Sequence, residues 1–580
     1  MTAKPLAKPR ERWRHRLVRT LLYGRNVDRA AKARARVGLV IVAFAAAYLV
    51  IGGRLVMFAV GADTHGARQA ASKDAIATAR PDIVDRNGEI LATDIKAPSL
   101  FGEPRRTIDK DEAIELLTAT LPDLDTAEVR ERLSSKKGFV WLKREITPQQ
   151  QQEIHRLGIP GIGFLRENKR VYPTGNEVAH LIGLVNIDNQ GIAGMEKWLD
   201  SNGLADLHRA GLATDRLQRP IELSVDLRVE HALRDELLKA KGKFHAKAAS
   251  GLVTDVRTGE VIAMVSLPDF DPNNPKEAQD PDRINRLTTG VYEMGSTFKA
   301  FTLAMALDSG KYGLNSMWDA RGPLHYGKFV IHDDEPKGRF LNMKEVFTFS
   351  SNVGAARIAL AQGPEAHRAF LRKMGQLERL RTELPESASP IVPRHWGELN
   401  TITIAFGHGM AVAPLQAVMG VSALVNGGYL IPPTFLKRSE QEAMALAKRV
   451  IKPETSQKMR FLMRLNAEIG TARKADVNGY YIGGKTGTAE KVVNGRYAKK
   501  RVLTAFTAII PADKPRYQLL IMLDEPQALS ETHGFITSGW NAVPTAANVI
   551  SRIAPILGIE PRFDLPPPDR LILAASRTTQ

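Results

Sequence analysis

The stretch "YEMGSTFKAF", residues 292–301, places Ser296 three residues before Lys299, between a glycine and an apolar run. In a helix, residues i and i+3 share a face, so the amine of Lys299 can reach the hydroxyl of Ser296. A serine hydroxyl becomes a good nucleophile when a base removes its proton, and a neutral lysine can be that base. The following residues have helical periodicity, with Gly310 as a stop, so Ser296 is predicted at a helix start. Free backbone N–H groups there can bind an oxyanion.

The same residues also fit a purely structural interpretation. Serine is a preferred helix N-cap. The Ser-x-x-Lys pattern is also frequent by chance, and Ser134 and Lys137 repeat it in a charged stretch. Taken alone, the motif does not distinguish a nucleophile from a helix cap.

Two further motifs decide between these interpretations. The stretch "FTFSSNVGAA" contains the chain's only Ser-x-Asn, at Ser350 and Asn352, and "YIGGKTGTAEK" contains its only Lys-Thr-Gly, beginning at Lys485. Lys-Thr-Gly by itself would fit a hairpin turn. The three motifs follow one another in the order and at the wide spacing that are typical of serine acyl transferases.

With these motifs the chain resembles the class B penicillin-binding proteins, the peptidoglycan transpeptidases. The resemblance extends over about residues 80–560 and includes four further stretches, "DIVDRNGEILA", "RVYPTGNEVAHLIGLV" with "GIAGMEKWLD", "GEVIAMVSLPDFDPN" and "FGHGMAVAPLQ". Asn352, in place of aspartate, favours the septal, cell-division type over the rod-elongation type. Met294 stands where many members have proline. His408 stands where Tyr or Gln is frequent, and we assign it no role.

The resemblance implies a role for each motif residue in a two-step acyl transfer. Ser296 would attack the D-Ala-D-Ala bond of a stem peptide, Lys299 would take its proton, and Ser350 would relay a proton to the leaving amine. Asn352 would hold Lys299 and the substrate amide. The remaining site residues are Lys485 as the neighbouring cation, Thr486, Gly487 and Thr488 as substrate-binding residues, and the backbone N–H groups of Ser296 and Thr488 as the oxyanion hole.

Lys299 must be neutral near pH 7 for this chemistry, so its pKa must fall by about three from roughly 10.4. We expect partial burial and the nearby cation Lys485 to cause this change. Gly483, Gly484 and Gly487 leave the segment around Lys485 without bulk. We therefore expect an edge strand along which a peptide substrate can lie as an added strand.

The N-terminal region predicts a membrane anchor. Residues 1–36 hold twelve Lys or Arg against Glu11 and Asp28, a net charge of +10 out of +18 for the chain. Residues 37–53 carry no charge, and the apolar run continues past Arg54 to residue 60, which is long enough to cross a bilayer. The positive-inside rule places the arm in the cytoplasm and the bulk of the chain in the periplasm. A cleaved signal peptide is the alternative, but the apolar region exceeds the usual length.

The whole-chain prediction is an α+β protein with five parts. They are a cytoplasmic basic arm at 1–36, a transmembrane anchor at 37–60, an elongated periplasmic pedestal at 61–220, a transpeptidase domain at 221–560 and a C-terminal tail at 561–580. Residues 249–266 predict a hairpin, residues 502–525 two strands, and residues 544–557 a helix. A helical middle is expected at 296–470. We expect one antiparallel sheet, assembled from distant segments and covered by helices.

The composition limits the function classes. With no cysteine, the chain has no disulfide, thiolate zinc site or cysteine nucleophile. We expect no metal and no organic cofactor. Nucleic-acid binding is disfavoured because the basic arm is tethered to a membrane and has only Trp13 and Tyr23 for stacking.

The expected partners are peptidoglycan stem peptides, β-lactams, the inner membrane, a glycan-polymerising membrane partner of the FtsW type and other division proteins. Three alternatives stay open: a β-lactamase or β-lactam sensor, an elongation-type transpeptidase, and a catalytically idle scaffold.

Overall fold

The computed structural model describes residues 29–60, 79–201, 219–493, 495–564 and 567. The chain divides into two compact units, Met1–Ala75 and Ile76–Gln580. Most of the predicted basic arm, the juxtamembrane residues 61–78 and most of the predicted tail lie outside the described residues.

The first unit contains one long helix, α2 (Arg29–Val60). Its segment Val37–Arg54 has a mean hydropathy of 2.0, and none of this segment is buried within the protein. An α-helix rises by about 1.5 Å per residue, so a helix of this length can cross the hydrocarbon layer. By length and composition, α2 fits the predicted anchor.

The N-terminal part of the second unit is built on a long antiparallel ribbon. Strand β2 (Ile90–Gly102) pairs along its length with β4 (Ile162–Val171), and β1 (Ile83–Val84) pairs with the start of β2. The predicted Asn87–Gly88 turn joins β1 to β2. Asp85 Oδ1 accepts hydrogen bonds from the backbone N–H groups of Asn87 and Glu89 there, and Gly88 has a φ of 91°.

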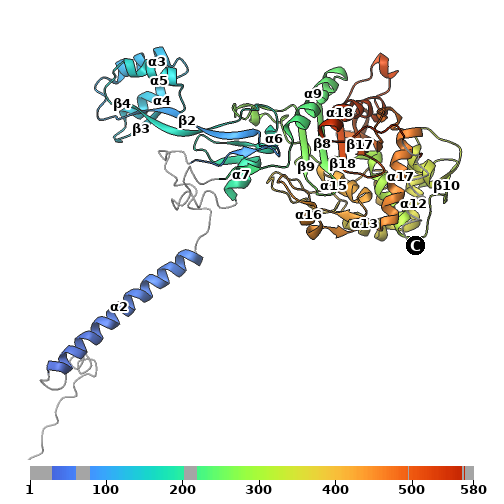
Figure 1. Ribbon diagram of the computed structural model, residues 1–580, viewed down its shortest axis with the longest axis horizontal. Coiled ribbons are helices and arrows are strands. Elements are labelled where there is room, and N and C mark those ends of the chain that lie inside the picture. The colour runs from blue at the N-terminus through green and yellow to red at the C-terminus, as the bar shows by residue number, and fades with distance from the viewer. Residues whose placement is uncertain (1–28, 61–78, 202–218, 494, 565–566, 568–580) are drawn as a thin grey trace, which may run out of the picture. The chain divides into compact units, whose positions relative to one another are not determined.

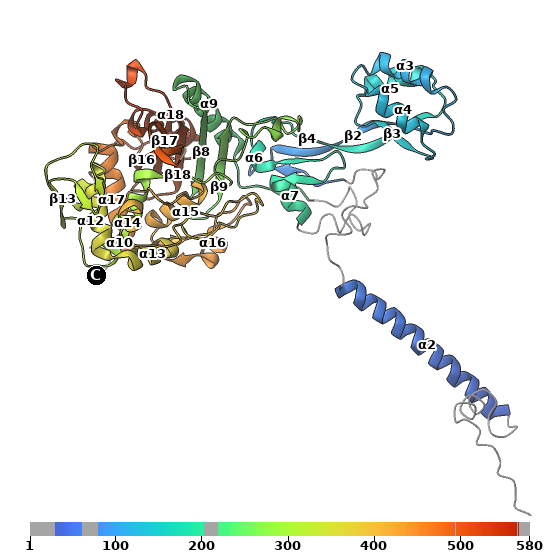
Figure 2. The same ribbon diagram turned by 180° about the vertical axis from the view of Figure 1, so that it is seen from behind.

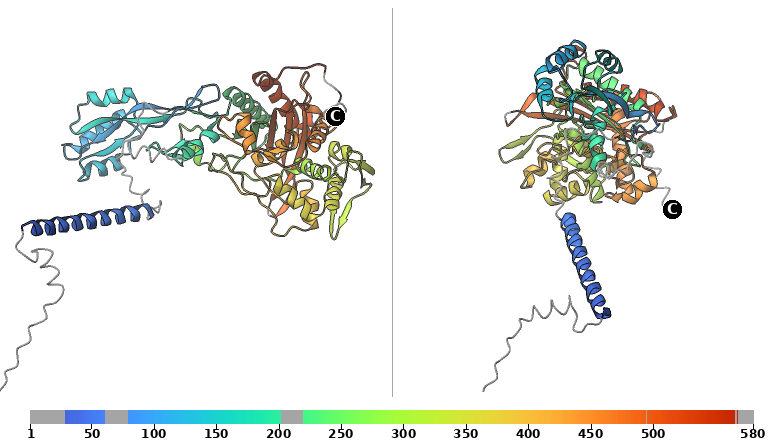
Figure 3. Two further views of the ribbon diagram at one scale, coloured as in Figure 1. Left: turned by 60° about the horizontal axis from the view of Figure 1, so that its bottom comes forward. Right: turned by 90° about the vertical axis from the view of Figure 1, so that its left-hand side faces the viewer.

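A helical lobe packs at the far end of this ribbon, beside β3 (Val140–Lys143), which pairs with the last residues of β2 (Figure 3). Its helices begin at the capping residues Asp109, Asp125 and Thr147. They are α3 (Lys110–Thr120), α4 (Thr126–Ser134) and α5 (Pro148–Arg156). Four short elements follow: α6 (Ala179–Ile182), β5 (Leu184–Val185), β6 (Gly191–Ala193) and α7 (Gly194–Leu199).

The C-terminal part contains a five-stranded antiparallel sheet in the order β16-β17-β18-β8-β9. Its strands are β8 (Ala248–Asp255), β9 (Val261–Leu267), β16 (Gly483–Val493), β17 (Arg496–Ile510) and β18 (Tyr517–Asp524). The two ends of this region therefore meet in one sheet, as predicted. Strand β8 pairs directly with β18, although most of this region lies between them in the sequence.

Helices cover both faces of this sheet (Figures 1 and 2). Helices α9 (Leu227–Lys243) and α18 (Ala542–Ile556) share one apolar core with one face, and α10 (Lys299–Asp308), α15 (Pro414–Val425) and α17 (Pro453–Ile469) share another core with the other. In β18, Leu519 and Ile521 enter the first core, whereas Leu520 and Met522 enter the second. This explains why the strand is a continuous apolar run.

This part contains five further α-helices among the described residues. They are α11 (Met343–Thr348), α12 (Asn352–Gln362), α13 (Pro364–Lys373), α14 (Glu398–Ile404) and α16 (Glu440–Leu446).

Two details differ from the sequence prediction. The strand at 221, predicted to open the transpeptidase domain, is β7 (Ile221–Glu222), and it pairs in parallel with β1 of the N-terminal sheet. The middle at 296–470 is not wholly helical. It also contains the pairs β10 (Met317–Ala320) with β13 (Arg339–Asn342), β11 (Leu324–Tyr326) with β12 (Phe329–Ile331), and β14 (Tyr429–Leu430) with β15 (Lys448–Arg449). These strands are too short for periodicity to reveal them.

Candidate active site

Ser296 lies in a 3₁₀ turn, η3 (Gly295–Phe298), which leads directly into α10. Within this described segment neither η3 nor α10 has a side-chain cap, so Ser296 does not act as an N-cap. Instead, Nζ of Lys299 lies 2.9 Å from Oγ of Ser296. Gly295 has a φ of 52°, and a Cβ at this position would lie 2.6 Å from the backbone oxygen of Thr488. The glycine therefore lets the turn approach β16.

The Ser-x-Asn motif joins α11 to α12 and brings two side chains to the same lysine. Nζ of Lys299 donates to Oγ of Ser350 at 3.0 Å, to Oδ1 of Asn352 at 2.7 Å, and to the backbone oxygen of Ser350. Ser350 has a φ of 58°, the left-handed conformation that non-glycine residues seldom adopt. Such backbone strain is characteristic of functional sites.

Lys485 reaches the cluster from β16, which forms one edge of the sheet among the described strands. Its Nζ donates to Oγ of Ser350 at 3.0 Å and to the backbone oxygen of Thr486 at 3.2 Å. A Cβ at Gly487 would lie 2.6 Å from the backbone oxygen of Met294. The small residues thus let β16 lie directly against the turn that carries Ser296.

The two predicted substrate-binding threonines have partners that the sequence did not indicate. Oγ1 of Thr486 lies 2.7 Å from Oγ1 of Thr471, and Oγ1 of Thr488 accepts from the backbone N–H of Ser538 at 3.2 Å. Thr471 follows α17, and Ser538 lies in the segment before α18. Neither residue belongs to a local motif, so only the packing of these segments against β16 identifies them.

Both lysines are fully buried, with 0% of their surface exposed. Burial lowers the pKa of Lys299 to about 7, against the opposing influence of the carboxylates of Asp333 and Asp334. Burial and the charge of Lys299 lower the pKa of Lys485 well below its usual value. The prediction of partial burial was therefore wrong: burial is complete and is the main cause of the low pKa of Lys299. The predicted effect of Lys485 on the pKa of Lys299 is not found: besides burial, the causes there are the two carboxylates, and the charge interaction between the lysines acts at Lys485.

The surroundings of Lys299 accommodate a neutral amine. Its Nζ has four oxygen atoms within hydrogen-bond reach, and two of them belong to hydroxyl groups that can also donate. The backbone oxygen of Ser350 and Oδ1 of Asn352 can only accept. A neutral amine that donates to these two oxygens keeps its lone pair for the hydroxyl of Ser296, which is the geometry of a base beside its nucleophile.

His408 lies close to this cluster without a hydrogen bond to the motif side chains in the described structure. Its ring centroid is 5.4 Å from that of Phe406 and 5.5 Å from that of Tyr497. Burial, with the charge of Lys299, lowers the pKa of His408 to about 4. The imidazole is therefore neutral at pH 7 and packs against aromatic rings.

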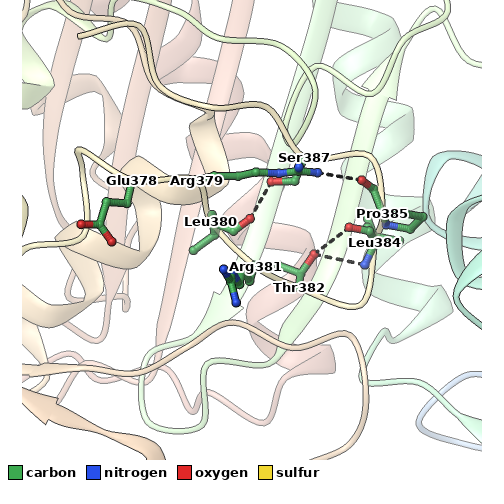
Figure 4. A pocket seen from close by; sticks show the side chains of 8 residues that line it. All are labelled: Glu378, Arg379, Leu380, Arg381, Thr382, Leu384, Pro385 and Ser387. Carbon is green, nitrogen blue, oxygen red and sulfur yellow. Dashed lines mark hydrogen bonds between the residues drawn. The ribbon is translucent and has the colours of Figure 1, made fainter. Parts of the chain in front are cut away.

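A separate cavity of about 440 Å³ lies in the segment between α13 and α14 (Figure 4). Its lining residues are Glu378, Arg379, Leu380, Arg381, Thr382, Leu384, Pro385 and Ser387. None of them is a motif residue, so convergence of side chains, not cavity size, locates the candidate site. The described residues contain no group of three or more metal-binding side chains.

The chain is similar to known proteins in sequence and in fold. Residues 249–539 match the family model for the penicillin-binding protein transpeptidase domain, and residues 75–202 match that for the penicillin-binding protein dimerisation domain. The chain is 40% identical over 497 residues to the probable peptidoglycan D,D-transpeptidase FtsI of Caulobacter vibrioides, covering 84% of this chain and 83% of that one. It is 30% identical over 518 residues to the peptidoglycan D,D-transpeptidase FtsI of Escherichia coli K12, covering 84% and 85%.

Among solved structures, the chain is similar to penicillin-binding protein 3 of Mycobacterium tuberculosis in complex with aztreonam. The TM-score is 0.64 at 24% identity, with 85% of this chain and 98% of that one covered. A peptidoglycan synthetase of Bifidobacterium adolescentis has a TM-score of 0.65 at 22% identity, with 85% and 97% covered. At this identity the structural likeness establishes the fold.

Proposed function

The chain belongs to the class B penicillin-binding proteins, and from this premise we propose that it is a peptidoglycan D,D-transpeptidase that cross-links stem peptides at the division septum. One observation carries the proposal: five motif side chains meet in a single hydrogen-bonded cluster. They are Ser296, Lys299, Ser350, Asn352 and Lys485.

In the first step, Oγ of Ser296 bonds to the carbonyl carbon of the penultimate D-alanine, and the peptide bond to the terminal D-alanine breaks. Lys299 takes the hydroxyl proton, for which a pKa of about 7 suits it. Ser350 lies within hydrogen-bond distance of both lysine amines and passes a proton to the leaving nitrogen. The products are free D-alanine and an ester on Ser296.

In the second step, an amine of a neighbouring stem attacks the ester carbonyl. Its proton passes to the Lys299–Ser350 pair while the new amide bond forms. Oγ of Ser296 leaves and regains its proton. A β-lactam enters the first step by opening its ring amide, and because the amine stays tethered, the second step is blocked.

We place the stem peptide along the free edge of β16. Thr486 and Thr488 bind its terminal carboxylate, with Gly487 between them leaving room for the peptide. The backbone N–H groups of Ser296 and Thr488 serve as the oxyanion hole. The close approach of Gly295 to Thr488 supports this pairing. Loss of one such donor typically lowers the rate by about 10²–10³-fold.

The test is covalent labelling of the full-length protein in detergent with a fluorescent penicillin, followed by mass spectrometry of the peptides. We expect the label on Ser296 and none on the Ser296→Ala variant. A label on another residue, or undiminished labelling of Ser296→Ala, would overturn the proposal. Release of D-alanine from a D-Ala-D-Ala peptide by the wild type checks the natural reaction.

A β-lactamase or β-lactam sensor would share the acyl chemistry, with water as the acceptor in the lactamase. The match of residues 75–202 to a penicillin-binding protein domain favours the transpeptidase. The lifetime of the benzylpenicilloyl enzyme separates the two functions, because a lactamase turns over in seconds and a transpeptidase stays acylated for hours. Localisation of a fluorescent fusion to the septum or to the lateral wall separates the septal from the elongation type.

For the cell, we propose a single-pass inner-membrane protein with a cytoplasmic N-terminus and a periplasmic catalytic part. The apolar segment of α2 and the basic arm before it support this topology. We further propose a glycan-polymerising membrane partner of the FtsW type and other division proteins. Co-purification of the full-length protein with such a polymerase from detergent-solubilised membranes tests this partnership, and its absence after mild cross-linking would count against it.

A further inference from the structure

The start of α12 is held by a segment outside the three motifs. Residues 332 and 333 follow β12 directly. Oδ2 of Asp333 accepts from the hydroxyl of Ser351 at 2.7 Å, and Oδ1 accepts from the backbone N–H of Val353 at 2.9 Å. The backbone oxygen of His332 accepts from Nδ2 of Asn352 at 3.0 Å. Three consecutive residues at the helix start are thus tied to two consecutive residues of one loop.

These contacts decide which end of the Asn352 amide faces Lys299. Because Nδ2 is bound to the oxygen of His332, Oδ1 is the atom left to face Nζ of Lys299, 2.7 Å away. A rotated amide would place its NH₂ group against the amine of Lys299 and its oxygen against the backbone oxygen of His332, which can only accept. The loop therefore specifies the acceptor that Lys299 meets.

Asp333 also holds the rest of the motif. Ser351 caps α12 by accepting from the backbone N–H of Gly354 at 2.9 Å, while its own hydroxyl proton goes to Asp333. Ser351 lies between Ser350 and Asn352, so a shift of Ser351 moves both contacts of Lys299. A carboxylate is also the favourable group at a helix N-terminus.

Several charged and titratable groups face the amine of Lys299. Asp333 and Asp334, from the loop after β12, raise its pKa against the effect of burial. Lys485 approaches from β16 across the shared hydroxyl of Ser350. The neutral His408 approaches from the loop after α14.

We propose that Asp333 is a positioning residue for the acyl transfer: it fixes the start of α12 so that Ser350 and Asn352 bind Lys299, and it adds a negative charge to the surroundings of that amine. The inference rests on the proposed function, because the position matters for catalysis only if Lys299 serves Ser296.

The variants Asp333→Asn and Asp334→Asn separate the two parts of this role. Each removes one negative charge that acts on Lys299. Asp333→Asn also replaces one of two accepting oxygens by an NH₂ group, so either Ser351 or Val353 loses its acceptor. Asp334 is exposed and makes none of the described hydrogen bonds to the start of α12. The variant Asp334→Asn is therefore the matched control for the loss of charge alone.

The measurement is the second-order rate constant for acylation of the full-length protein by a fluorescent penicillin from pH 5 to 9. Because neutral Lys299 is the base, the wild-type rate rises with pH around its pKa. Removing a carboxylate lowers that pKa, so both variants move the rising limb to lower pH. Asp333→Asn also lowers the high-pH plateau by about 10–100-fold, in line with the effect of small displacements of catalytic groups. Asp334→Asn stays within about threefold, as expected for an exposed site.

Equal acylation rates of Asp333→Asn and Asp334→Asn at high pH would overturn the positioning role. A pH dependence of Asp333→Asn that rises at the same pH as that of the wild type would overturn the charge role. If Asp333→Asn fails to fold, Ser351→Ala breaks the same hydrogen bond without a charge change. It should lower the plateau and leave the limb in place, and a wild-type plateau there would contradict the inference. Failure of the proposed function is separate, since the wild type itself would then not be labelled at Ser296.

Discussion

Ser350 is the residue on which the two buried lysines converge. Its hydroxyl lies 3.0 Å from Nζ of Lys299 and 3.0 Å from Nζ of Lys485. Two like charges fully buried around one hydroxyl would repel strongly, so at least one amine must be neutral. Burial thus accounts for a base at neutral pH.

Removal of this hydroxyl should disable proton transfer and leave the fold intact. We expect Ser350→Ala to lower the acylation rate by about 10²–10⁴-fold, the usual contribution of a positioned proton-transfer group. Stopped time courses with a fluorescent penicillin at pH 8 measure the change, and thermal melting checks folding. Ser316→Ala, in a loop after α10, is a control for the loss of a hydroxyl. A decrease of less than threefold would exclude a relay through Ser350.

At the scale of elements, the site depends on close contact between η3 and the edge strand β16. The contact is possible because Gly295 and Gly487 lack side chains where the two backbones meet. The start of α12, held by the loop of residues 332 and 333, forms the third side of the site beside η3 and β16. These three elements lie far apart in the sequence.

A methyl group at Gly487 should push β16 away from η3. A Cβ there would lie 2.6 Å from the backbone oxygen of Met294, which is closer than van der Waals contact allows. We expect Gly487→Ala to lower acylation by about 10²–10³-fold, as for loss of an oxyanion donor. Gly313→Ala is the control, since a Cβ there has no neighbour within 4 Å. Wild-type acylation by Gly487→Ala would show that the strand can shift without losing the site.

At the scale of the second unit, the N-terminal sheet and the transpeptidase part share one continuous apolar core. This core contains Leu91 and Met195 together with Phe298 and Leu303. Polar contacts also cross the boundary, including the exchange of two hydrogen bonds between Asn273 and the backbone of Tyr172. The two parts are therefore packed against each other rather than linked only by a loop.

The N-terminal part contains buried ion pairs. Glu196 is 0% exposed and lies 2.7 Å from both Arg80 and Arg170. Glu196→Gln leaves two buried cations short of a counter-charge and should destabilise by about 3–5 kcal/mol. Chemical denaturation measures this loss. Glu128→Gln, which disrupts an exposed pair with Arg132, should change stability by less than about 1 kcal/mol. Similar losses for both variants would contradict the argument.

Glu230 should make the stability of the second unit depend on pH. It lies at the start of α9, is 1% exposed, accepts from the backbone N–H of Met264 at 2.7 Å, and burial raises its pKa to about 7. Between its unfolded pKa of about 4.5 and 7, the folded state binds more protons, so stability is lost as pH rises through this window. Glu230→Gln does not titrate. Its stability relative to the wild type should therefore rise by about 1–3 kcal/mol from pH 4.5 to 8.

Denaturation of both proteins across this pH range tests the sign. A constant difference would show that Glu230 does not titrate in the window, and a falling difference would reverse the argument. The absolute difference at one pH is not diagnostic, because the amide also alters the hydrogen bond to Met264.

Much of the fold followed from local patterns. The hairpin of β8 and β9, the strands β17 and β18, the helix α18 and the Asn87–Gly88 turn were all predicted from periodicity and turn residues. The short strands β10 to β13 and the pairing of β7 with β1 were not. Such short strands carry too little periodicity, and pairing partners depend on distant segments.

The chemical groups of the site, their order along the chain and the apolar anchor segment could be predicted from the sequence alone, because residue identity and hydrophobic periodicity are local properties. The sequence could not determine that both lysines are wholly buried, or that Thr471, Ser538 and Asp333 lie beside the motifs. These features are visible only in the folded protein, because burial and proximity arise when segments that are far apart along the chain pack around one sheet.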